Sequence, residues 1–187
     1  MARRFSIAAL PVAVALLVAA CGTAPAPRLP VVSPPPLRLA PAALPGGLAL
    51  QQRLTFVRDG RRDTVDALVE VDAEAVRVVV HAQGQVALRF TWDGETLAQT
   101  RDPRLPAAVQ AGRVLDDLQY AYWPPTAIAA ALPPGWTLQA DAAHRVLRFD
   151  DDPRPVLEAT RLGDGSVRLA WPGQGFELHI ASRPVTP

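Results

Sequence analysis

Residues 65–94, VDALVEVDAEAVRVVVHAQGQVALRFTWDG, decide the fold, because this stretch contains three strand-like segments in a row. Apolar side chains recur at every second position along residues 65–71, with Asp66 and Glu70 on the opposite face, and again along residues 86–92. This two-residue period is typical of β-strands, and Asp93-Gly94 marks a turn after the third segment. The connections are too short for parallel crossovers, so the stretch predicts an antiparallel meander.

Further strands are expected on both sides of this stretch. One precedes it at residues 47–56 and one follows at 95–101, and the pattern returns in five segments nearer the C terminus: 135–140, 144–149, 155–162, 166–172 and 175–182. Between the two groups, Val114, Leu115, Leu118 and Tyr122 have helical spacing, and Pro124-Pro125 end that helix. A second short helix is expected at 126–132. The sequence therefore predicts an α+β fold with one or two helices inserted mid-chain.

We expect the antiparallel sheet to curve around the helical segment, so that the helices pack on its concave face. The helix is then either a packed core element or the lid of an apolar cavity. The residues alone favour a packed core, because apolar helix faces usually belong to cores.

The N terminus has the three parts of an export signal. Arg3 and Arg4 supply the positive start, and residues 5–20 are apolar and end in small side chains. Val18-Ala19-Ala20-Cys21 resembles the lipobox of bacterial lipoproteins, in which the cysteine thiol takes a diacylglycerol and the preceding peptide is cleaved. We therefore predict a signal peptide at 1–20 and acylation, of the palmitate type, at Cys21, the single cysteine of the chain. The alternative is an ordinary secretory signal followed by a chance cysteine.

By the same resemblance, Gly22 in place of an aspartate after the cysteine indicates the outer membrane. The expected location is its periplasmic face, where the protein is held through the lipid anchor. Residues 21–45 are predicted to form a tether, since they contain eight prolines and favour extended polyproline II. The remaining residues, 46–187, are enough for one domain with its own core.

Composition excludes several functions. The 187 residues carry a formal charge of +1, without a basic excess that would bind nucleic acid. The chain contains no lysine, which excludes Schiff-base chemistry and P-loop phosphate binding. We expect no cofactor.

The sequence contains no recognisable set of catalytic residues. His81, His144 and His179 are far apart and lack metal-ligand spacing, so no metal site is predicted. Ser166 has no G-x-S-x-G surroundings, and Asp150-Asp151-Asp152 before a proline is typical of a turn. Adjacent Asp116 and Asp117 point about 100° apart on a helix and cannot share one site. The protein is therefore not expected to be an enzyme, and a hydrolase using His144 or the acidic triplet is the weakest alternative.

The strings LALQQRL, DALVEVD, TWDG, RVLDDLQYAYWP and LPPGWTL resemble an uncharacterised family of bacterial outer-membrane lipoproteins. Its members are often encoded in gene clusters that make aryl polyene pigments. The similarity covers about residues 45–180. The strand–helix–strand layout and the anchor also resemble the LolA/LolB lipoprotein carriers. That resemblance implies a half-open antiparallel barrel in which helices close an apolar cavity for acyl chains.

Aromatic residues around the helix are the remaining candidates for a binding site. Tyrosine and tryptophan combine a large apolar body with a polar tip, which suits a cavity wall, although they equally suit a packed helix end. The predicted ligand-binding residues are Trp92, Leu118, Tyr120, Tyr122, Trp123 and Trp136.

Two functions follow from these residues. The leading expectation is a lipoprotein that binds, carries or positions a hydrophobic molecule, an acylated or polyene lipid, with Tyr122 and Trp123 at the lid. The alternative is a non-catalytic interaction module that holds a partner protein of the cell envelope and has a fully packed core.

Overall fold

The computed structural model describes residues 31–105 and 109–185. The described residues from Val31 onward form one compact unit. The predicted signal peptide and Cys21 lie outside the described residues. Within the described part, no helix is both long and apolar enough to cross a bilayer.

Ten antiparallel strands form one continuous, unclosed sheet in the order β5-β4-β3-β2-β1-β10-β9-β8-β7-β6. The first meander is followed by helices α1 (Ala111–Tyr122) and α2 (Pro125–Ala131), and then by the second meander. The strands of the first meander are β1 (Leu48–Arg58), β2 (Arg61–Val71), β3 (Val76–Ala82), β4 (Gln85–Trp92) and β5 (Leu97–Arg101). Those of the second are β6 (Trp136–Ala140), β7 (His144–Phe149), β8 (Leu157–Arg161), β9 (Val167–Trp171) and β10 (Phe176–Pro184). Short 3-10 helices occupy Pro41–Ala43 and Pro172–Gln174. The predicted α+β class and curved antiparallel sheet are confirmed.

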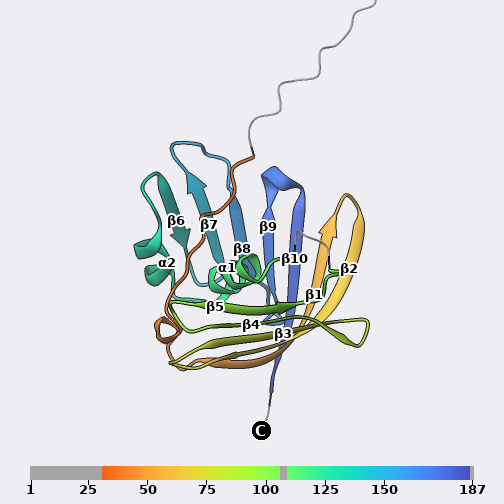
Figure 1. Cartoon of the computed structure of the whole chain (residues 1–187). Helices are drawn as coiled ribbons and strands as arrows, with labels where there is room; N and C mark the ends of the chain where they lie inside the picture. Colours follow the sequence, from red (N-terminus) through yellow and green to blue (C-terminus); the bar gives the residue numbers. More distant parts are fainter. Residues whose placement is uncertain (1–30, 106–108, 186–187) are drawn as a thin grey trace, which may run out of the picture. The chain divides into compact units, whose positions relative to one another are not determined.

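The two meanders meet at β1 and β10, which pair antiparallel from Leu50↔Pro184 to Arg58↔Phe176. The first and last strands of the chain therefore form the centre of the sheet, and β5 and β6 become its two edges. Figure 1 shows that β3, β4 and β5 bend away from the upright strands β6–β10, with α1 lying in the angle between them. The sheet is thus a half-open barrel, and the helices connect its two edges.

In most strands, alternate residues point to the concave side and form the core together with α1, whereas the edge strands β5 and β6 contribute only partly buried side chains. Val76, Val78 and Val80 of β3 are buried, and their neighbours are less so. Leu54 of β1 and Ile180 of β10 face each other across the seam and join the same cluster. Because both meanders contribute to one core, the fold has no internal domain boundary within the described residues.

The segment before β1 differs from the predicted tether. Leu37 and Pro41 are buried, and Leu39 and Leu44 pack against the core. We call residues 35–40 the strap; Figure 1 shows this segment running down past α1 before the chain enters β1. The compact unit therefore begins before Gly46, the residue at which the sequence placed the start of the domain. Proline content predicted an extended backbone there, but not that this backbone would be packed.

Candidate functional site

Three of the predicted ligand-binding aromatics are buried and contact the chain's own strap. Trp92 Nε1 donates to the Leu39 carbonyl at 2.8 Å, and Trp123 Nε1 donates to the Ala40 carbonyl at 3.2 Å. The Tyr120 hydroxyl donates to the Pro35 carbonyl at 3.1 Å. Aromatic side chains that donate to the carbonyls of an extended proline-rich segment are a recurring way of recognising such peptides. Here the recognised segment belongs to the same chain.

Two polar residues of α1 complete the contact with the strap. Gln119 is fully buried; its side chain accepts from Leu39 N at 3.2 Å and donates to Leu39 O at 2.9 Å, as a neighbouring strand would. Asp116 accepts from Leu37 N at 3.2 Å and pairs with the Arg38 guanidinium at 2.5 Å. Burial raises the pKa of Asp116, and Arg38 partly offsets this effect. The strap is therefore held by side chains rather than by a strand ladder.

The other three predicted residues have different surroundings. Leu118 is buried in the core. The Tyr122 hydroxyl lies 2.9 Å from both Gln52 Nε2 and Ser182 Oγ, which places it against the β1–β10 seam. Trp136 is half-buried on β6 and packs against Phe149, with ring centroids 5.0 Å apart. The structure thus brings Trp92, Tyr120 and Trp123 together around the strap but separates Tyr122 and Trp136 from them.

The interior between α1 and strands β6–β8 is filled. A small gap remains beside Tyr120, Leu138 and Leu147, and it leaves no room for a water molecule. The Arg145 guanidinium closes the C-terminal end of α1 by donating to the Tyr120 and Trp123 carbonyls, both at 2.8 Å. A cation at this position also complements the negative end of the helix dipole. In the described state, the concave face is covered by packed side chains.

Sequence reasoning missed a second cluster on the same face. The Arg113 guanidinium lies 4.8 Å from the ring centre of Trp171, and Arg113 Nε donates to Asp117 at 2.9 Å. Burial raises the pKa of Asp117 to about 7 against the attraction of Arg113. Trp171 is fully buried, and its Nε1 has no hydrogen-bond partner among the described residues. Asp116 and Asp117 thus face different partners, as their helical spacing predicted.

The position of Gln119 in the sequence indicated part of the contact with the strap that the sequence analysis missed. Gln119 follows Leu115 by four residues, so a polar side chain stands on the apolar face of α1. Buried amides are normally hydrogen-bonded, and this position therefore indicated an internal partner. Nothing in the local pattern identified the strap as that partner.

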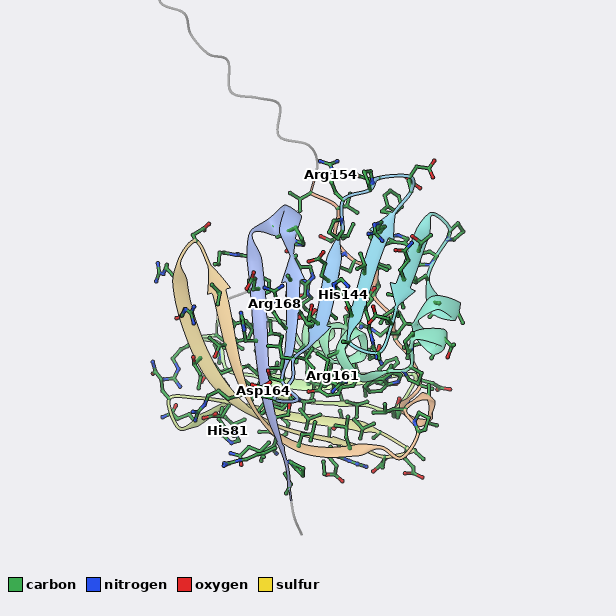
Figure 2. The ribbon with its side chains drawn as sticks, turned by 180° about the vertical axis from the view of Figure 1, so that it is seen from behind. His81, His144, Arg154, Arg161, Asp164 and Arg168 are labelled. Carbon is green, nitrogen blue, oxygen red and sulfur yellow. The ribbon has the colours of Figure 1, made fainter. Side chains whose placement is uncertain are left out.

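Residues considered for catalysis do not converge. Figure 2 shows His81 and His144 well apart on the rear of the sheet. His179 lies 3.1 Å from Glu177 on the outer side of β10, and Asp152 pairs with Arg154 at a turn. No group of three or more metal-ligating side chains occurs among the described residues. An outer groove of about 320 Å³ lies beside His81, Leu68 and Gln83, at the end of the β3–β4 hairpin.

Comparison with known proteins identifies the family. Residues 49–184 match the sequence model of a family described as a protein of unknown function (DUF3261). The match covers more than half of the chain, so the protein belongs to this family. No curated protein matches the chain significantly.

Proposed function

We propose that this member of the DUF3261 family is a lipid-anchored envelope protein that binds a hydrophobic molecule on the concave face of its half-open barrel. The molecule is an acylated or polyene lipid, which the protein carries or positions in the periplasm without chemical change. Cys21 is the proposed anchor, and the outer membrane, on its periplasmic face, is the proposed location.

The manner in which the concave face is covered is the observation that carries this proposal. The apolar side chains of ten strands converge on one face. Their cover is α1 and the strap, and neither is hydrogen-bonded into the sheet ladder. The strap is attached by a few side-chain-to-backbone hydrogen bonds, each of which contributes only about 1 kcal/mol net. The proposal requires that this cover moves while the strand ladder of the barrel stays intact.

Removal of the cover would expose a large apolar surface. On the strands, Val78, Leu88, Leu147 and Leu169 are each at most 2% exposed while the cover is in place. Burial of apolar area stabilises by about 25 cal/mol per Å². A bound hydrocarbon chain can therefore replace the contacts that the displaced strap gives up.

The interaction module remains the second candidate, and a specific observation favours it. The space beneath α1 is filled, without room for a water molecule beside Tyr120. A module of this kind needs a packed core and binds its partner on the outside. Such a partner would bind in the groove beside His81 on the outer face.

Native mass spectrometry separates the two functions. The chain beginning at Val31, the start of the compact unit, is exported to the periplasm of a host that makes aryl polyene lipids. We expect a discrete added mass that organic extraction removes. A clean apo mass from that host, together with a partner protein captured by crosslinking, would contradict lipid binding and support the interaction module.

A further inference from the structure

The Trp171 indole is a buried donor without an acceptor. Its side chain is fully buried on the concave side of β9, and no described residue accepts from Nε1. An unpaired buried donor is destabilising, so native structures rarely keep one without a reason such as an absent ligand or water. The other three tryptophans differ: Trp92 and Trp123 donate to the strap, and Trp136 is half-buried at an edge strand.

A guanidinium with unused donors lies against the same indole. Arg113 uses Nε for Asp117 and stacks over the ring of Trp171, whereas its two terminal nitrogens donate no hydrogen bond among the described residues. Arginine presents several donors in a fixed plane that suits a carboxylate. The unused N–H groups of Arg113 and Trp171 are therefore candidate donors to an anion.

An aromatic track leads from this pair to the rim of the sheet. Phe176 packs against Trp171 at 4.9 Å between ring centroids, and Phe56 stacks on Phe176 at 6.1 Å. Both phenylalanines are half-buried, so the track passes from the interior to the surface. The Arg58 guanidinium lies over Phe176, the middle ring of this track, at 5.1 Å from the ring centre. A flat or extended apolar chain fits along such rings.

We infer that the molecule bound on the concave face has a carboxylate head group, which accepts from Trp171 Nε1 and pairs with Arg113, and an apolar chain that lies along Phe176 and Phe56. This inference rests on the proposed function and specifies its ligand class as a fatty acid or polyene carboxylic acid. Because Trp171 lies on β9 beneath α1 and Arg113 belongs to α1, the head group enters when α1 and the strap move away from β9, and the pair forms again when α1 closes over the bound head group.

A fluorescent polyene fatty acid, cis-parinaric acid, tests the head group. It is bound to the chain beginning at Val31 and then displaced by a fatty acid or by the fatty alcohol of equal length. The wild-type chain should prefer the acid by roughly tenfold or more, since hydrogen bonds to charged groups contribute about 1.5–3 kcal/mol. Trp171→Phe and Arg113→Gln should lose this preference but keep their affinity for the alcohol. Trp136→Phe is the matched control and should keep the preference, as should Arg113→Lys in part.

A second measurement covers the case in which Trp171→Phe fails to fold. In the wild-type chain, the indole N–H proton resonance of Trp171 should move downfield when the acid is added but not when the alcohol is added. Equal affinity of the wild-type chain for acid and alcohol would overturn the carboxylate site and leave lipid binding intact. If the wild-type chain binds neither probe, this inference fails, and an added mass in the native spectrum would still support the proposed function.

Discussion

At the scale of single residues, the concave side contains two buried polar groups whose hydrogen-bond or charge partners do not fully compensate for their burial. Asp117 is paired with Arg113 but so buried that its pKa rises to about 7. Trp171 is buried with an unused N–H. A well-packed core normally satisfies its polar groups, and departures from this rule are concentrated at functional sites. These two residues belong to one cluster on β9 and α1, which is why we place the head-group site there.

The raised pKa of Asp117 predicts a stability that depends on pH. Below pH 4 the carboxyl is protonated in both the folded and the unfolded chain. Between about pH 4 and pH 7 the folded chain keeps the proton while the unfolded chain releases it, so the free energy of unfolding falls as the pH rises. The loss from this residue is at most about 4 kcal/mol.

Asp117→Asn should flatten this slope, because asparagine does not titrate. Urea unfolding at pH 4.5, 6 and 8 measures the effect. Asp66→Asn, at an exposed pair with Arg53, is the control and should leave the slope unchanged. An equal slope in wild type and Asp117→Asn would contradict the raised pKa.

At the scale of elements, the strap and α1 form the cover of the barrel. The strap lacks regular secondary structure up to the 3-10 helix at Pro41 and is fixed by side chains of α1 and β4. Gln119 is central to this contact, since one buried amide satisfies both backbone groups of Leu39.

Gln119→Ala should loosen the strap. It removes two hydrogen bonds and leaves Leu39 N–H without an acceptor, which together cost about 2–4 kcal/mol. Hydrogen exchange at the Leu39 amide and urea unfolding measure the two effects. Gln139→Ala removes an exposed glutamine of β6 that bonds to Arg148, and it should change the stability by less than about 0.5 kcal/mol. Unchanged protection of Leu39 in Gln119→Ala would show that the amide does not hold the strap.

At the scale of the whole molecule, the β1–β10 seam joins the two meanders into one cooperative unit. Leu54 of β1 is buried there opposite Ile180, and β2 and β9 continue the sheet on the two sides. A defect at the seam is therefore shared by strands that lie far apart in sequence.

Leu54→Ala should destabilise the fold by about 2–5 kcal/mol, because it leaves a cavity in the shared core. Hydrogen exchange should show that amides of β3 and β8 lose protection together. Leu162→Ala, the same substitution at an exposed site, should have almost no effect. Loss of protection confined to the first meander would mean that the two meanders unfold independently.

The sequence by itself determined the elements of this fold. The strands between residues 65 and 94, the helix that ends at Tyr122 before Pro124 and the second group of strands follow from periodicity and turn residues, which act over a few positions. The one notable shift is that β2 begins at Arg61, before the alternating stretch, because pairing with β1 extends it. The class of the fold was likewise predictable, since short connections require antiparallel neighbours.

Only the tertiary structure decided what the concave face contacts. The aromatic residues were recognised as a group, but whether they line a cavity or bind the strap depends on residues about 80 positions away, such as Pro35 and Tyr120. Trp171 was overlooked for the same reason, because its unused N–H and its contact with Arg113 arise from packing between β9 and α1. Periodicity determines which side of an element is apolar. Long-range packing alone determines what covers that side.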